Sequence, residues 1–259
     1  MFRELKNECR IRLDLIAQGP LCIRSGESFE LHPGQPDIAV VRSMLDGKMQ
    51  PVIPGSSLKG VFRSRAEKYL PDSCNIFDKK NKCFYNSKNL STGKERYKAV
   101  CEACKLFGNL SLKSRVEFSD AFPVEGTVKT GTRYQVTIDR LTGAARKGAL
   151  FETEVVEKGT FKTEISLRNF SSHQIKVLLL VIQDINEGYV RIGSSTSRGF
   201  GRVTAENIAI SYRDYSRPGD GIGTFYEKEY DWETCLEKLK TVSLNTSEGV
   251  NMDGIPDLE

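Results

Sequence analysis

Two long segments of this chain carry apolar side chains at the spacing of an α-helix, and segments of alternating polarity surround both of them. The first helix is expected to start at Pro54-Gly55-Ser56-Ser57, with a serine as its N-cap, and to end before Pro71. The second is expected to be capped by Ser172 and to stop at Gly188. The apolar stripes are Leu58, Val61, Phe62, Ala66, Tyr69 and Leu70 in the first helix, and Ile175, Leu178, Leu179, Ile182 and Ile185 in the second.

The alternating segments predict strands on both sides of the helices. Residues 9–23 alternate before they break at Gly19-Pro20, and a short C-terminal helix is expected over 232–242. Further strands are expected at residues 38–41, 116–121, 134–138, 151–169 and 202–212. This order of strand, helix, strands, helix and strand predicts an α+β fold with helices on one face of an antiparallel sheet.

Residues 71–100 are polar and lysine-rich, with no usable apolar period, so this insertion cannot build a core of its own. Four cysteines in and beside it, Cys74, Cys83, Cys101 and Cys104, have the spacing C-x8-C-x17-C-x2-C. A CxxC pair turns two thiolates toward one tetrahedral centre, and a structural zinc ion would supply the missing folding energy. Four thiolates leave no open coordination position for catalysis. Reduced thiols without a metal are the alternative.

Composition describes an ordinary globular chain of 259 residues, 39% hydrophobic and 28% charged. No run approaches the roughly 18 apolar residues that a membrane span needs, and the N-terminus lacks the apolar core of a secretory signal. We therefore expect a cytoplasmic protein with no membrane association. In that compartment seven cysteines are expected to be thiols or metal ligands rather than disulfides.

Positive charge is concentrated in four segments, residues 54–70, 78–105, 126–150 and 188–202. They hold 20 basic and five acidic residues, a net +15, whereas the whole chain carries only +4. Segregation of this size indicates one side that faces a polyanion. Solvated surface loops are the alternative for any single segment.

Two of these segments contain turns of small residues beside cations, Ile53–Gly60 and Arg191–Arg202. Small residues let a phosphate-bearing strand approach the backbone, and lysine and arginine neutralise its charge. Residues 125–150 are rich in glycine, lysine and arginine and precede a strand, which predicts a long basic hairpin; a loop folded back on the domain is the alternative. Together these features indicate an RNA-binding protein rather than a small-molecule enzyme.

With these motifs assembled, the chain resembles the RAMP superfamily of CRISPR-associated proteins over about residues 9–212, and more closely the repeated backbone subunit of type III effector complexes. The matching residues are Asp37 in Gln35-Pro36-Asp37-Ile38-Ala39-Val40, Pro54-Gly55-Ser56-Ser57-Leu58-Lys59-Gly60, Cys101–Cys104 followed by Lys105-Leu106-Phe107-Gly108, Thr137-Ile138-Asp139-Arg140, and Gly193–Gly201.

The resemblance implies a single RAMP domain. Its ferredoxin-like, RNA-recognition-type palm would comprise residues 1–70 and 106–212, with a protruding β-hairpin thumb at about 125–165. Residues 71–105 would be the zinc-binding insertion and 213–244 a C-terminal extension, and we expect 245–259 to be disordered.

The resemblance also implies the partners. Guide RNA, complementary target RNA and neighbouring RAMP subunits, either copies of this chain or paralogues, would assemble with it, and each thumb would push between guide nucleotides. The implied RNA contacts are Ser56, Ser57, Lys59, Arg63, Lys129, Arg133, Arg140, Arg146, Lys147, Gly193, Arg198, Gly199, Gly201 and Arg202.

In catalytic members of the family a loop aspartate, matched here by Asp37, is needed for cleavage of target RNA in the presence of Mg²⁺ or another divalent cation. A carboxylate can hold such an ion, or position a ribose 2′-OH, beside a phosphate. Ser43 stands where relatives often carry a second acid. Two alternatives remain: a subunit that only holds RNA, and a ribonuclease that processes guide precursors with His32 in the same loop.

Overall fold

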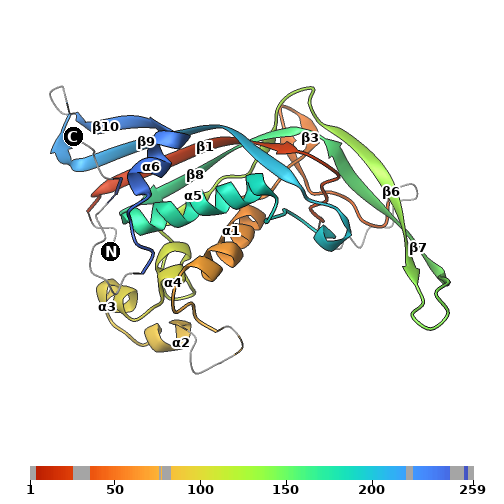
Figure 1. The fold of residues 1–259 in the computed structure, drawn as a ribbon, viewed down its shortest axis with the longest axis horizontal. Coiled ribbons are helices and arrows are strands. Elements are labelled where there is room, and N and C mark those ends of the chain that lie inside the picture. The colour runs from red at the N-terminus through yellow and green to blue at the C-terminus, as the bar shows by residue number, and fades with distance from the viewer. Residues whose placement is uncertain are drawn as a thin grey trace.

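An antiparallel sheet forms the centre of the molecule. The computed structural model describes residues 4–25, 36–75, 77, 83–219, 224–245 and 254–255. The strands are β1 (Asn7–Ala17), β4 (Val116–Phe118), β5 (Phe122–Pro123), β8 (Thr160–Arg168), β9 (Val203–Pro218) and β10 (Phe225–Asp231). They are ordered β10-β9-β1-β8-β4, and β5 also pairs with β8 (Figure 1).

Alternation along β1 gives the sheet two different faces. Cys9, Ile11 and Leu13 are buried, whereas Arg10 and Arg12 between them are exposed on the opposite face. Each fully buried aliphatic side chain contributes about 1.5–3 kcal/mol by leaving water. The apolar face is therefore the one that the helices must cover.

The helices α1 (Gly55–Tyr69) and α5 (Ser172–Glu187) lie across that face, and α6 (Trp232–Leu239) packs beside α5 (Figure 1). A polar clasp joins the two long helices. Asp184 of α5 accepts hydrogen bonds from Arg65 Nε at 2.7 Å and from the Tyr69 hydroxyl at 2.6 Å, both on α1. The expected α+β fold with an antiparallel sheet is confirmed.

Both helix starts differ from the expected caps. Pro54 is the N-cap of α1 and makes no side-chain bond; instead Asp120, distant in sequence, accepts the Gly55 N–H at 2.7 Å. A serine is not needed there because β4 brings its neighbouring loop against the helix. The N-cap of α5 is Ser171, which forms a capping box with Gln174, so the cap lies one residue before Ser172. Gly188 ends α5 in the left-handed conformation, as expected.

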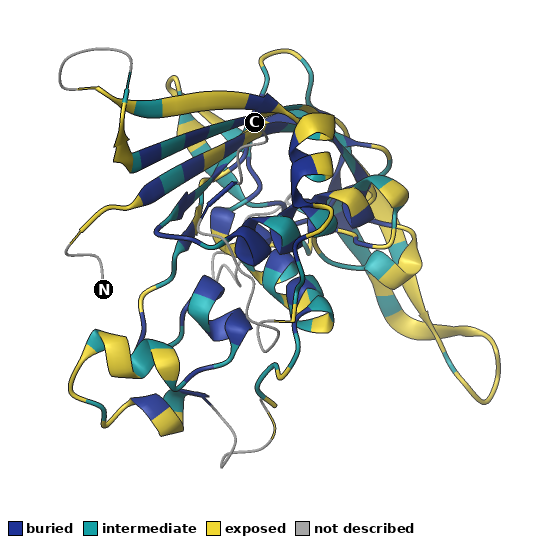
Figure 2. Ribbon diagram, turned by 60° about the vertical axis from the view of Figure 1, so that its left-hand side comes forward, coloured by how far each residue is buried: buried dark blue, intermediate teal, exposed yellow. Residues whose placement is uncertain are grey.

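Two hairpins leave the central sheet. The longer one pairs β6 (Lys129–Ile138) with β7 (Ala145–Lys158), and its distal end is largely exposed (Figure 2). The strand expected over 151–169 is therefore divided at Gly159 between this hairpin and β8. The shorter hairpin, β2 (Arg42–Leu45) and β3 (Lys48–Pro51), was not expected, although Asp46-Gly47 at its turn is a typical hairpin sequence and both residues have positive φ.

The root of the long hairpin is bonded to the sheet and to the turn that precedes the hairpin. The Leu21 and Val156 backbones exchange hydrogen bonds at 2.9 and 2.8 Å, and Ala17 N–H donates to the Gly159 carbonyl at 2.9 Å. On the other side Val124 N–H donates to the Thr160 carbonyl at 2.8 Å. The hairpin is thus anchored where β7 passes into β8.

The cysteine-bearing insertion contains three short helices, although its sequence has no regular apolar period. These are α2 (Cys83–Ser87), α3 (Gly93–Lys98) and α4 (Glu102–Phe107). A capping box between Thr92 and Glu95 starts α3, and this T-x-x-E sequence is a local indication of a helix start.

Two further expectations concern the ends of the chain and membranes. Most of residues 245–259, where disorder is expected, lie outside the described residues. Ile255 is only 3% exposed and Gly254 N–H donates to the Phe170 carbonyl, so these two residues pack against the body of the protein. Among the described residues no helix combines the length and apolar character needed to span a membrane.

Candidate functional site

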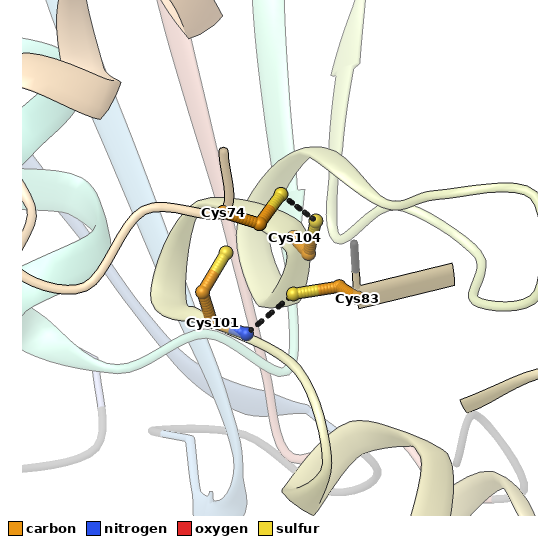
Figure 3. A group of neighbouring side chains, drawn as sticks. All are labelled: Cys74, Cys83, Cys101 and Cys104. Atoms are coloured by element: carbon orange, nitrogen blue, oxygen red, sulfur yellow. Dashed lines mark hydrogen bonds between the residues drawn. The ribbon is translucent and has the colours of Figure 1, made fainter. Parts of the chain in front are cut away.

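The four cysteines of the insertion converge on one point. Cys74 follows α1, Cys83 begins α2, Cys101 is the N-cap of α4 and Cys104 lies within α4. Their sulfur atoms all lie within 4.8 Å of one another (Figure 3). The expected cluster is confirmed as a group that can hold a metal ion.

The cluster geometry fits tetrahedral coordination. Sulfur ligands about 2.3 Å from a central ion stand roughly 3.8 Å apart at tetrahedral angles, and Cys74 Sγ and Cys104 Sγ are 3.8 Å apart. The Cys101 N–H donates to Cys83 Sγ at 3.1 Å, which favours a thiolate there. Cys83 and Cys104 are buried, which shields their sulfurs from water, whereas Cys74 and Cys101 are half-buried.

Burial, together with repulsion among the thiolates, limits how many of them ionise without a cation. The hydrogen bond from the Cys104 thiol lowers the pKa of Cys101 to about 4, whereas burial raises the pKa of Cys83 to about 11. One thiolate therefore forms easily and the next ones do not. A divalent cation among the sulfurs offsets this repulsion and allows all four to ionise.

The insertion is bound to the body of the protein by polar contacts at both long helices. His173 of α5 contacts Glu102 of α4 at 3.0 Å, and both side chains are buried. On the other side Arg63 of α1 contacts Glu67, the Gly108 carbonyl and Cys104 Sγ. The metal-binding loops are therefore rigidly placed on the α1–α5 layer.

Asp37 is an exposed residue at the root of the long hairpin, on an otherwise half-buried segment that runs along β7. Its Oδ2 accepts the Glu152 N–H at 2.8 Å. Ile38 N–H donates to the Glu152 carbonyl at 3.0 Å, and its own carbonyl accepts the Glu154 N–H at 2.8 Å. The backbone of β7 thus fixes both the carboxylate and the residue that follows it.

A partly buried ion pair holds the next part of this segment. Arg42 makes a two-pronged contact with Glu154 of β7, with Nη1 at 2.8 Å from Oε2 and Nη2 bonded to Oε1. The same Oε2 accepts the Val40 N–H at 3.1 Å. Asp37, Ile38, Val40 and Arg42 are therefore all bonded to β7, through Glu152 and Glu154.

We expect Glu154→Gln to lower the free energy of unfolding near neutral pH by about 1–2 kcal/mol, since it removes a charged acceptor that is partly screened by solvent. The Arg42 hydrogen bonds hold the pKa of Glu154 below its ordinary value of about 4.3. The stabilisation is therefore complete above that value and is lost as pH falls through the lower folded-state pKa. Urea unfolding of both proteins from about pH 7 to pH 3 checks this. A difference that did not shrink with acid would contradict it.

The glycines of the turn at 191–202 pack against other backbone segments. A Cβ at Gly193 would overlap the Cys22 carbonyl, and one at Gly201 would overlap the Ile192 carbonyl, whereas Gly199 faces open space. All three have positive φ. Gly193 and Gly201 are thus required by the fold itself, and Gly199 is the one beside which another molecule can approach.

This turn contacts both the Asp37 segment and the hairpin. Phe200 is buried in a small cluster with Cys22, Val40 and Val155. Arg198 Nη1 donates to Gln135 Oε1 of β6 at 2.6 Å, and Gln135 Nε2 donates to the buried Thr153 hydroxyl at 3.0 Å. The structure therefore brings together Asp37, the Gly193–Gly201 turn and the hairpin root, as one site.

The remaining predicted contacts are more dispersed. Lys59, in α1, is partly buried, and burial followed by the neighbouring Arg63 lowers its pKa. Arg133 is bound to Glu157 through two bonds of 2.9 Å. The residues that stand exposed are Ser56, Lys129, Arg140, Arg146, Lys147 and Arg202, while Ser57 is half-buried. In Figure 1 α1 begins toward the side from which the hairpin projects. His32 lies outside the described residues.

The sequence offered no indication of Arg42, Gln135, Thr153 or Glu154, which position the segments of this site. Arg42 and Glu154 are 112 residues apart, and no local spacing links them. Glu154 lies in a segment of alternating polarity, so its sequence predicts an exposed polar residue of a strand. Its contact with Arg42 arises only because the folded hairpin places β7 beside residues 37–42.

Known proteins resemble this chain in sequence. A sequence model of the RAMP superfamily matches residues 14–204. A protein of Methanocaldococcus jannaschii named "CRISPR system Cms endoribonuclease Csm3" is 27% identical over 211 residues, 71% of this chain and 73% of the relative. A protein of the same name from Methanothermobacter thermautotrophicus is 24% identical over 267 residues, 88% of this chain and 100% of the relative.

Proposed function

Because this chain belongs to the RAMP superfamily, we propose that it is a guide-RNA-binding backbone subunit of a type III CRISPR interference complex and cleaves complementary target RNA in a metal-dependent reaction. Both similar proteins are named endoribonucleases, which favours a cleaving subunit over one that only holds RNA. Guide RNA, target RNA and neighbouring RAMP subunits are the partners that this function requires.

The strand order supports a ferredoxin-like palm. The chain runs β1, α1, β4, β8, α5 and β9, and the sheet order β9-β1-β8-β4 places the first strand between the last and the third. The β6–β7 hairpin, inserted before β8, is the proposed thumb. β10 and α6 form the proposed C-terminal extension.

The observation that carries the proposal is the position of Asp37. Its exposed carboxylate is attached to β7 of the proposed thumb, on a segment whose Val40 packs with Phe200 of the Gly193–Gly201 turn. A target phosphate displaced by the thumb would lie beside this carboxylate. One carboxylate is a sparse ligand set for Mg²⁺, so we propose that RNA phosphates supply further oxygen ligands.

Charge supports RNA on the hairpin side of the molecule. Within the described part of the chain, no ion pair engages Arg140, Arg146 or Lys147 at the hairpin end, so all three are available to phosphates. On the open face of the sheet the arginines are already paired, including Arg12 with Glu164 at 3.1 Å, Arg168 with Glu8 at 2.9 Å and Arg213 with Glu227 at 2.7 Å. Paired charges attract phosphate weakly.

We also propose zinc as the metal of the cysteine cluster. Four soft thiolates in tetrahedral arrangement select zinc over the oxygen-seeking cations. Such a closed set of ligands stabilises structure and takes no part in cleavage.

The test of the proposed function is an assay of the guide-loaded complex with complementary and non-complementary RNA, each in Mg²⁺ and in EDTA. We expect cuts only in complementary RNA and only with Mg²⁺. Binding without cutting would indicate a scaffold subunit, and cuts that persist in EDTA would overturn the metal-dependent mechanism. Absence of guide-dependent binding would overturn the proposal as a whole.

A further inference from the structure

We propose that Arg63 supports the metal cluster from outside its coordination shell and is not an RNA contact. Its guanidinium group positions the Cys104 sulfur by a hydrogen bond and links α1 to the insertion. Its position on α1, four residues after Lys59, groups it with the phosphate-binding residues on the sequence alone. The inference rests on the proposed zinc site, and it is independent of the proposed cleavage of RNA.

The contacts of Arg63 use every nitrogen of its guanidinium group. Nε donates to Glu67 Oε1 at 2.8 Å, Nη1 to the Gly108 carbonyl at 2.9 Å and Nη2 to Cys104 Sγ at 3.4 Å. The side chain is 30% exposed. These bonds use three of the five guanidinium N–H groups and hold the side chain against the insertion, so only one N–H on each of Nη1 and Nη2 is left for another acceptor.

The partners of Arg63 are themselves fixed. Gly108 ends α4 with a φ of 78°, and its N–H donates to the Cys104 carbonyl at 2.9 Å. A Cβ at Gly108 would crowd the backbone of Ser114 and Leu112. Nη1 and Nη2 therefore bind both ends of one tight turn, and they define where the Cys104 sulfur lies.

Charge explains why an arginine is favoured here. A divalent ion with four thiolates carries a formal charge of −2 in a partly buried place, and a hydrogen-bonded cation offsets part of it. The planar fork of arginine reaches the sulfur and the carbonyl together, which the single ammonium of lysine cannot do. Glu67 keeps the fork in this orientation from the next turn of α1.

The experiment compares wild type, Arg63→Gln, Arg63→Lys and Lys59→Gln as full-length chains. Metal content by elemental analysis of the wild type comes first. Zinc affinity is then measured by competition with a chromophoric chelator, and Co²⁺ loading reports thiolate coordination through its charge-transfer absorption. Affinity for guide RNA is measured with every protein saturated with zinc.

We expect Arg63→Gln to weaken zinc binding about 10- to 100-fold, the usual effect of removing a partner of a metal ligand. Arg63→Lys, which keeps the charge, should recover part of this loss. Lys59→Gln removes the same charge one turn earlier and should leave zinc affinity unchanged while it weakens RNA binding.

Zinc affinity of Arg63→Gln within about twofold of wild type would overturn the inference. So would RNA affinity that falls as much in zinc-saturated Arg63→Gln as in Lys59→Gln. If Arg63→Gln does not fold, Arg63→Lys decides by the same criteria. A wild-type chain without bound metal would overturn the zinc site and this role together, whereas failure of Lys59→Gln to affect RNA would count against the proposed RNA surface only.

Discussion

Asp37→Ala is expected to abolish cleavage of complementary target RNA by the guide-loaded complex, a loss of about 100-fold or more in rate. The variant removes the carboxylate that we place at the displaced phosphate. It should leave RNA affinity nearly unchanged, because Ile38 and Val40 still hold the segment to β7. Single-turnover cleavage and a binding isotherm measured on the same preparation separate the two effects.

Asp37→Asn sharpens this prediction because the amide keeps an oxygen for the Glu152 N–H while the charge is lost. We expect it to be as inactive as Asp37→Ala. Asp46→Asn is the matched control: Asp46 is another exposed aspartate nearby in the sequence, with a φ of 48° that asparagine tolerates. Full cleavage by Asp37→Asn, or an equal loss in Asp46→Asn, would exclude Asp37 as the catalytic carboxylate.

Replacing Cys101 and Cys104 together by serine is expected to release the metal and unfold the insertion, at a cost of more than about 5 kcal/mol in the free energy of unfolding. The cost is large because the buried apolar cluster of the insertion contains little besides Cys83, Val100, Cys104 and Leu112. Zinc content and amide hydrogen exchange over residues 83–107 measure both effects, and chelation of wild type should reproduce them.

Cys235→Ala provides the control for the cysteine variant. Cys235 is fully buried but lies in α6, outside the cluster. Its loss should cost about 1–2 kcal/mol through the small cavity that remains, with zinc content unchanged. Slow hydrogen exchange in the insertion of the double serine variant would contradict a metal-dependent fold.

Local patterns in the sequence were sufficient for the two long helices and for most of the sheet. The stripes from Leu58 to Leu70 and from Ile175 to Ile185 predicted α1 and α5, because a helix buries residues that are near one another in sequence. The cap of α1 was wrong because a distant residue, Asp120, accepts the first N–H. Short elements such as α2 and α4 were missed because they depend on the cysteine cluster more than on their own periodicity.

The same distinction applies to the candidate site. The cysteine cluster was predictable because Cys101 and Cys104 form a CxxC pair, a metal-binding pattern contained in four residues. Gly193 and Gly201 were singled out for approach by RNA, yet their conformations and neighbours show that backbone packing already requires glycine at both. The bonds that orient Asp37 and its segment come from β7, and no local pattern could place that strand against residues 37–42.

The attachment of the long hairpin has a mechanical consequence. Only Gly159 separates β7 from β8, and β8 lies between β1 and β4 in the middle of the sheet. A sideways load on Leu141 at the free end therefore acts as a bending moment on strands that are hydrogen-bonded on both sides. The hairpin is therefore a two-stranded cantilever clamped at its root, and a load at its free end is carried into the central sheet through β8.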